Sequence, residues 1–215
     1  MSKQQTPVSE HSRALFFPTS NVHKVTEVEA ILTELLPEWR VYTLQDFPDW
    51  AVEVAETGDS YEANARLKVW PYADNPLGLP VIADDSGVEV TALPGLLGIY
   101  SHRWYVGSDA DRVAALLGKL STCDNRELVY RCCFALLVPT EGEAVPPVIQ
   151  YFMGELRGQA ACEACGTTGF GYDPIMIPDG YEQTLAELSQ EEKNKISHRR
   201  RALEGLAEYV KATRS

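Results

Sequence analysis

A chain of 215 residues is long enough to bury a full hydrophobic core, and at this length a single domain is expected. The formal net charge of −12 argues against a long nucleic acid as partner, because such a ligand selects a basic face. No apolar run approaches the roughly 18 residues that a membrane helix needs, and residues 1–13 lack the apolar core of a signal peptide. We therefore expect a cytoplasmic protein without membrane partners, in which a disordered lead-in over 1–13 precedes one domain over 14–215.

The first elements follow from short apolar patterns. Residues 14–17 predict a buried strand, and the sequence PTSNVHK predicts the loop after it. A helix is expected next, because apolar side chains recur at helical spacing until Pro37: Val25, Val28, Leu32 and Leu35. Residues 39–44 predict a second strand.

Residues 46–60 read as a loop that contains Glu56, and residues 60–70 read as a helix stopped by Pro71. The segment LPVIADDSG, 79–87, predicts a buried strand with Asp84 and Asp85 at its carboxyl end, and residues 88–93 predict a further strand. Gly87 would provide a turn between the two.

In the second half, Ser108 predicts an N-cap with Asp111 at the third helical position. Residues 127–138 and 148–158 predict a long antiparallel hairpin around a turn that contains proline and glutamate. A glycine-rich loop, GTTGFGYDP, follows, and Ser197 is a plausible N-cap for the last helix. Strand–helix units combined with a hairpin predict one α/β domain on a mixed sheet.

The acidic pair poses a question of chemistry. Asp84 and Asp85 would point to opposite sides of a strand, so that at most one faces a given cleft unless the backbone turns between them. Carboxylates at the end of an apolar strand are costly to bury alone, which favours a divalent cation or a basic neighbour. From the dipeptide alone, a solvated turn is an equally good interpretation.

Three other segments contain candidate binding groups. The loop TSNVHK leads into a helix N-terminus, where free N–H groups and Lys24 could hold an anion, or where Ser20 or Asn21 could simply cap the helix. FGYDP could stack on a base or form a tight turn into a strand. Residues 192–201 hold six basic groups, counting His198, which either lie on a solvated helix start or bind phosphate and base.

Five cysteines are expected to be reduced in a cytosolic chain, and CEAC at 162–165 has Cys-x-x-Cys spacing. A zinc site needs two more ligands, and the other cysteines form no second such pair. A metal or redox role is therefore the less favoured interpretation.

Taken together, these segments resemble the inosine triphosphate pyrophosphatase family, which hydrolyses non-canonical purine nucleoside triphosphates. The resemblance runs from about Ala14 to Val210 and includes TSNVHK, ETG, NARLK, ADDSG, PGLLGIYS, GFGYDP and EKNKISHRRRAL in the family's order. Ser20 stands where the family commonly has glycine, and Ala63 where many bacterial members have a glutamate.

The resemblance implies a two-lobed domain around a long mixed sheet with flanking helices, a fold related to the anticodon-binding-like and Maf folds. It also implies a Mg²⁺ requirement, a nucleoside triphosphate substrate and a homodimer. Glu56 and Asp85 would hold Mg²⁺, and Asp85 would accept the proton of the attacking water. The resemblance further implies that the triphosphate is held by Thr19, Ser20, Asn21, Val22, His23, Lys24, Ser86 and Lys193, and that base and sugar contact Phe170, Gly171, Tyr172, Asp173, His198 and Arg199.

The implied activity is release of pyrophosphate from ITP, dITP and XTP. His198, Arg199 and nearby backbone donors would recognise the 6-oxo group, and adenine, with an amino group there, would be rejected by up to about 10⁴-fold. Three alternatives stay open: a pyrophosphatase for modified pyrimidine nucleotides, a nucleotide-binding protein without catalysis, and a purely structural module.

Overall fold

The computed structural model describes residues 13–139 and 147–213. Within these residues, one six-stranded sheet has the order β2-β1-β3-β4-β5-β6. The lead-in expected over 1–13 lies outside the described residues except for Arg13, whose carbonyl accepts a hydrogen bond from the N–H of Arg40 at 2.9 Å. Among the described helices, none is both long and apolar enough to cross a bilayer.

The chain opens with a parallel strand–helix–strand unit. It consists of β1 (Ala14–Phe17), α1 (Val22–Leu35) and β2 (Arg40–Thr43), with β1 and β2 parallel. All four β1 side chains are buried, and they alternate between two cores: Leu15 and Phe17 face α1, whereas Ala14 and Phe16 face the opposite side. A short strand covered on both faces is apolar throughout, as its sequence indicated.

The strand that carries the acidic pair is longer than predicted. β3 (Val81–Val90) pairs with β4 (Glu127–Val138) along its whole length, whereas its pairing with β1 is confined to Phe16 and Val81. Asp84 and Asp85 therefore lie in mid-strand, and the expected strand end, the turn at Gly87 and the separate strand over 88–93 are wrong. Beyond Val81, one edge of β3 lacks a strand partner within the described sheet.

Gly87 does not form the expected turn; it allows another segment of backbone to pack closely against β3. A β-carbon on this residue would lie 2.1 Å from the carbonyl oxygen of Gly98, so only glycine lets the backbone of the Gly98–Tyr100 turn pack against β3.

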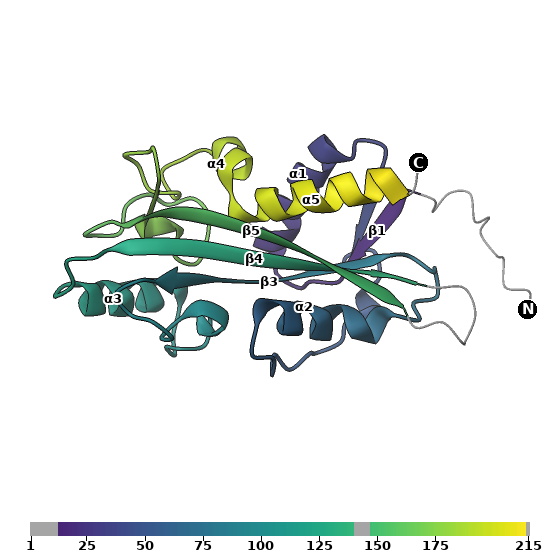
Figure 1. Ribbon diagram of the computed structural model, residues 1–215, viewed down its shortest axis with the longest axis horizontal. Coiled ribbons are helices and arrows are strands. Elements are labelled where there is room, and N and C mark those ends of the chain that lie inside the picture. Colours follow the sequence, from purple (N-terminus) through teal and green to yellow (C-terminus); the bar gives the residue numbers. More distant parts are fainter. Residues whose placement is uncertain (1–12, 140–146, 214–215) are drawn as a thin grey trace, which may run out of the picture.

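The predicted hairpin is confirmed and extends two residues further. β5 (Val148–Ala160) pairs antiparallel with β4 from Glu127 to Val138, and the expected turn falls largely on residues outside those described. Figure 1 shows α1 and α5 (His198–Thr213) on one face of this sheet and α2 (Tyr61–Val69) on the other. These elements form the first lobe, with one hydrophobic core on each face of the sheet.

The second lobe is built on the far ends of β3, β4 and β5. A third core joins these ends to α3 (Asp109–Leu120), β6 (Met176–Pro178) and the loops around them. The predicted N-cap is confirmed and forms part of a capping box, since Ser108 Oγ accepts from the N–H of Asp111 and the Asp111 carboxylate accepts from the N–H of Ser108. Short 3₁₀ turns occur at Pro48–Trp50, Trp70–Tyr72, Gly98–Tyr100 and Asp173–Ile175.

The C-terminal region contains a helix that the apolar spacing did not predict. α4 (Gln190–Ile196) precedes α5, and the two meet at Ser197, whose extended backbone separates them. Ser197 Oγ accepts from the N–H of Arg200 at 3.1 Å, which confirms the predicted N-cap. α4 is polar apart from Ile196, so a search for apolar stripes could not detect it.

Candidate functional site

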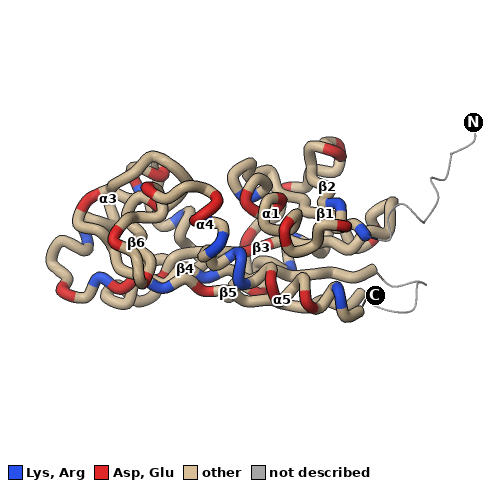
Figure 2. The backbone as a smooth tube through the Cα atoms, turned by 90° about the horizontal axis from the view of Figure 1, so that it is seen from above, with Lys and Arg blue, Asp and Glu red and all other residues tan. Residues whose placement is uncertain are grey.

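A cavity of about 550 Å³ lies where β3 continues past the end of β1. In Figure 2, α1, β1 and β2 lie toward the end of the molecule that carries the C label, and α3 and β6 lie toward the other end. Among the described residues, the cavity is bordered by fourteen of the sixteen expected site residues, while Val22 and Lys193 do not border it. The bordering ones are Thr19, Ser20, Asn21, His23, Lys24, Glu56, Asp85, Ser86, Phe170, Gly171, Tyr172, Asp173, His198 and Arg199.

Asp84 and Asp85 both border this cavity, although they point to opposite faces of β3. We expected only one of them to reach a given cleft without a turn, and that expectation is wrong. Because the adjacent edge of β3 carries no strand, the cavity extends around this edge and is open to side chains from both faces.

On one face, the N-terminus of α1 approaches Asp84. Asn21 caps the helix, because its Oδ1 accepts from the N–H groups of His23 and Lys24 at 3.1 and 3.2 Å. The cap fixes the first turn of α1, and Lys24, the third residue of this helix, points inward. Its Nζ donates to both carboxylate oxygens of Asp84 at 2.9 and 2.8 Å. The capping role of Asn21 is thus confirmed, and Lys24 is paired with Asp84.

Asp84 is held ionised by its neighbours. Burial disfavours the charged form, but the positive charges of Lys24, Arg199 and Lys68 outweigh it and lower the pKa of Asp84 well below its ordinary value. Arg199 Nε lies 3.4 Å from Asp84 Oδ2. Asp84 therefore organises cations around the cavity.

On the other face, α2 supplies an ammonium group to Asp85. Lys68 Nζ lies 2.7 Å from Asp85 Oδ1 and 2.8 Å from Glu56 Oε1, so that the two carboxylates share one cation. Asn64, one turn earlier on α2, donates to Asp85 Oδ2 at 3.1 Å. Arg103 also binds Glu56, at 2.8 Å.

Glu56 and Asp85, the two carboxyls that share Lys68, have pKa values that are shifted in opposite directions. Burial raises the pKa of Asp85, and the attraction of Lys68 does not fully offset it. For Glu56, burial also opposes ionisation, but Lys68 and Arg103 together lower its pKa. The surroundings therefore shift the two pKa values in opposite directions from their ordinary values.

Three of the six basic residues in 192–201, namely Lys193, His198 and Arg199, are buried, whereas Lys195 and Arg201 are exposed. Arg199 Nη1 donates to Glu27 Oε2 at 3.1 Å, and its Nη2 donates to Ser86 Oγ at 2.9 Å. Lys193 Nζ donates to Asp173 Oδ2 at 2.7 Å. Glu27, on α1, is 1% exposed and also lies 3.8 Å from the Lys193 ammonium, so one carboxylate holds both cations in place.

Asp173 also shapes the glycine-rich loop. Its Oδ2 accepts from the N–H of Phe170 at 2.8 Å, and the 3₁₀ turn that follows enters β6. Gly169 has a φ of +76°, and a β-carbon there would lie 2.1 Å from Asp173 Oδ2. The expected tight turn is thus present, and it presents Phe170 to the cavity.

His198 is buried, and its Nδ1 has no hydrogen-bond partner among the described residues. Burial, together with the charges of Arg199 and Lys193, lowers the pKa of His198 well below its ordinary value. The imidazole is therefore neutral at neutral pH.

Glu27, Asn64 and Lys68 are among the residues of this site that had no role assigned from the sequence. Each is a polar residue on the inward face of a helix, next to buried apolar positions such as Val28 and Ala65. A polar residue within a helical apolar stripe is the signal that could have revealed them.

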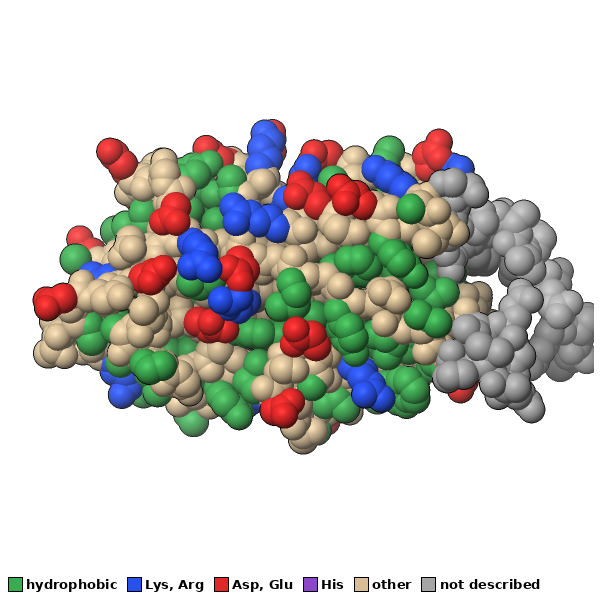
Figure 3. All heavy atoms as spheres, viewed as in Figure 1, with side chains coloured by type: hydrophobic (Ala, Val, Ile, Leu, Met, Phe, Trp, Pro, Cys, Tyr) green, Lys and Arg blue, Asp and Glu red, His purple; other side chains and the backbone are tan. Residues whose placement is uncertain are grey.

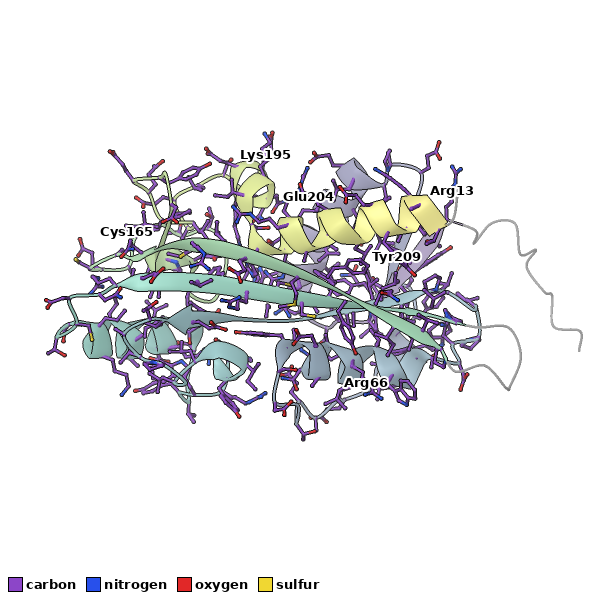
Figure 4. All side chains as sticks on the ribbon, in the orientation of Figure 1. Arg13, Arg66, Cys165, Lys195, Glu204 and Tyr209 are labelled. Atoms are coloured by element: carbon purple, nitrogen blue, oxygen red, sulfur yellow. The ribbon has the colours of Figure 1, made fainter. Side chains whose placement is uncertain are left out.

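Cys162 and Cys165 are both free thiols, and Figure 4 shows Cys165 at the end of the molecule opposite to Arg13. In the part of the chain that the structure describes, no three His, Cys, Asp or Glu side chains are placed to hold a metal ion.

Comparison with known proteins assigns the family. The model of the Ham1 family matches residues 15–209, which is most of the chain. The chain belongs to the Ham1 family. A relative from Symbiobacterium thermophilum, named dITP/XTP pyrophosphatase, is 41% identical over 203 residues, 93% of this chain and 96% of the relative. Another protein of that name, from Streptomyces avermitilis, is 39% identical over 201 residues, 92% of this chain and 96% of the relative.

Solved structures agree with the Ham1 assignment. The Ham1 protein of Staphylococcus aureus superposes with a TM-score of 0.77 at 33% identity, covering 93% of this chain and 99% of that one. A protein from Mycobacterium abscessus, described as a nucleoside-triphosphatase and dITP/XTP pyrophosphatase, gives a TM-score of 0.65 at 38% identity, covering 90% and 98%. The expected family and fold class are thereby confirmed.

Proposed function

We propose that this protein hydrolyses dITP, XTP and ITP to the nucleoside monophosphate and pyrophosphate. The relatives named dITP/XTP pyrophosphatase support the reaction. The observation that carries the proposal is the convergence of Glu56 and Asp85 on one cation, beside the capped N-terminus of α1 and in the same cavity. A purely structural module would need neither the shared cation nor the buried basic groups.

The carboxylate pair fits Mg²⁺. Lys68 Nζ shows that Glu56 and Asp85 can direct oxygens at a single positive centre. Two carboxylates with substrate phosphate and water are a common ligand set for this ion. We propose that Glu56 and Asp85 hold Mg²⁺, which, when bound, would lower the pKa of a water molecule and neutralise charge on the phosphates.

In the proposed reaction, water attacks the α-phosphorus, the bond from that phosphorus to the bridging oxygen breaks, and pyrophosphate leaves. Asp85 accepts the proton of the attacking water. Its raised pKa makes it a better proton acceptor than an ordinary aspartate, while Asn64 and Lys68 fix its orientation. Asp84, held ionised by several cations, is less suited to this role.

The phosphates would bind at the start of α1. The N–H groups of His23 and Lys24 already donate to Asn21 Oδ1, so the positive end of the helix dipole is the feature of the first turn that favours an anion. Lys24 adds a full charge, and Thr19 and Ser20 add hydroxyl groups along the same wall of the cavity.

The base would stack on Phe170 and be read by neutral hydrogen-bonding groups. The donors of Arg199 already engage Glu27, Asp84 and Ser86, so this residue is better suited to shaping the pocket than to meeting the base. The unpartnered Nδ1 of His198, when protonated in the neutral tautomer, could donate to a 6-oxo group. Adenine offers a donor at that position and would leave this buried group unpaired.

The test is pyrophosphate release from ITP, dITP, XTP, ATP and GTP with Mg²⁺, by the wild type and by Asp85→Asn. We expect turnover of the first three substrates, at least 100-fold weaker turnover of ATP, and near-complete loss in the variant. Equal turnover of ATP and ITP would refute the base preference. Tight ITP binding without turnover would favour a nucleotide-binding protein, and a preference for modified pyrimidine nucleotides would favour the other enzymatic alternative.

We further propose that the protein acts as a homodimer in the cytoplasm, where the nucleotide pool lies. On the face in Figure 3, hydrophobic side chains gather between α5 and α2. Val148, Tyr151 and Met153 on β5, and Trp70 next to α2, are each at least 40% exposed, and such a surface supports association. Light scattering of the purified protein measures the mass: a value near twice 23.9 kDa is expected, and a value near 23.9 kDa would refute the dimer.

A further inference from the structure

His23 and Phe170 contact each other across the cavity. His23 is the second residue of α1, in the first lobe, and Phe170 lies in the glycine-rich loop of the second lobe. Their ring centroids are 5.3 Å apart and the ring planes differ by 16°, so the two rings are stacked. Stacked rings with centroids about 4.5–7 Å apart are already in contact, and no third ring fits between them.

The two rings are not held equally. The N–H of Phe170 donates to buried Asp173, and its ring packs against Lys193 Nζ at 4.6 Å and the Arg199 guanidinium at 5.2 Å from the ring centroid. Lys193 and Arg199 are both buried, which fixes the ring from that side.

The imidazole of His23, in contrast, is exposed and makes no hydrogen bond or ion pair within the described part of the chain. The backbone of His23 is fixed, because its N–H donates to Asn21 Oδ1 at 3.1 Å. Its side chain can rotate about χ1 and χ2 without breaking a hydrogen bond, and such rotamer changes are fast in exposed residues. Of the two rings, His23 is therefore the one that can move away.

We propose that His23 covers the face of Phe170 on which the purine base stacks, and that substrate displaces it. This inference rests on the proposed function, since it assumes that Phe170 receives a base. His23 then competes with the base for one aromatic face, which differs from the phosphate contact that its place in the TSNVHK loop implied. Because substrate must break the contact between His23 and Phe170, the binding free energy of the substrate is reduced by the free energy of that contact.

Kinetics give the first test. His23→Ala removes the competing ring, and we expect KM for dITP to fall about 2- to 10-fold, the factor that one aromatic pair is worth. His23→Trp supplies a larger ring and should raise KM. The control is Thr26→Ala, an exposed position one turn further along α1 that does not border the cavity. A higher KM in His23→Ala would mean that His23 holds the base, and would overturn the proposal.

NMR gives a readout that does not depend on turnover. In the free protein, the ring current of Phe170 should shift the imidazole signals of His23, which His23→Gln assigns and Phe170→Leu should move. Saturating inosine monophosphate should move them toward their position in Phe170→Leu. Signals that stay shifted in the saturated complex would overturn the proposal, whereas failure of the wild type to release pyrophosphate would refute the proposed function alone.

Discussion

Asp84 and Asp85 are consecutive residues of β3, yet each is neutralised from a different face of the sheet. Asp84 accepts from Lys24 of α1 at 2.8 Å, and Asp85 accepts from Lys68 of α2 at 2.7 Å. Their acidities differ in direction as well, because the surroundings lower the pKa of Asp84 and raise that of Asp85. Two identical side chains thus have opposite pKa shifts, because cations outweigh burial at Asp84 and burial outweighs the cation at Asp85.

This contrast predicts that the same substitution lowers stability much more at Asp84 than at Asp85. Asp84→Asn leaves Lys24 and Arg199 facing each other with less compensation, and we expect it to lower the free energy of unfolding by about 3 kcal/mol. Asp85→Asn removes a charge that burial disfavours, so the loss should stay below about 1 kcal/mol. Urea denaturation of both variants measures the difference, and equal losses would contradict this account.

Replacing Lys68 tests whether Mg²⁺ binds at Glu56 and Asp85 and thereby raises the Tm of the protein. In Lys68→Met, Glu56 and Asp85 lose their shared cation, and their mutual repulsion should lower Tm in the absence of metal. Mg²⁺ should restore part of this loss, because binding to the folded state stabilises it.

The measurement is the rise in Tm on adding millimolar MgCl₂, which should be larger for Lys68→Met than for the wild type. Arg66→Met is the matched control, since Arg66 lies on the outer surface of α2 (Figure 4). An equal rise in all three proteins would argue against a metal at these two carboxylates.

His198 predicts a pH dependence of stability. Its pKa in the folded protein lies well below the value of about 6.5 in the unfolded chain. Below about pH 6.5 the unfolded chain binds a proton that the folded protein does not, so stability falls as pH decreases. Between pH 7 and 5, the free energy of unfolding of His198→Gln should fall less steeply than that of the wild type; parallel curves would show that His198 titrates normally.

Replacing Gly87 with alanine should lower stability through a steric clash. A β-carbon at this position would collide with the Gly98 carbonyl, which belongs to the backbone and cannot rotate away, so Gly87→Ala should cost at least about 2 kcal/mol. The control, Gly118→Ala, adds a methyl group to the α3 helix at a position with open space and should stabilise the protein by about 0.5–1 kcal/mol. A Gly87→Ala protein as stable as the wild type would show that the 98–100 turn can shift.

The limits of prediction from the sequence can be traced to individual residues. Apolar spacing predicted α1 and the β4–β5 hairpin because their side chains face a core. It could not predict α4, which is polar on most sides, and it ended β3 too early because Asp85, Ser86 and Gly87 resemble a turn. In the structure these residues stay in the strand because β4 pairs with each of them.

Most residues expected at the site border one cavity, but the contacts between them were not predictable from the sequence. The motifs brought Lys24, Asp85 and Phe170 into one cavity as expected. The pairing of Glu27 with Arg199, which joins α1 to α5 across 172 positions of sequence, depends on the packing of two distant helices. Apolar spacing within one helix does not reveal which residues of a distant helix it contacts.

The strands β3, β4 and β5 run without interruption from the first lobe into the second (Figure 1). Two bodies joined by a flexible linker can swing apart, but bodies that share a continuous hydrogen-bonded ribbon can move only as far as that ribbon bends or twists. Entry and exit of a ligand should therefore depend on rotations of side chains at the mouth of a nearly rigid groove, with little displacement of the lobes themselves.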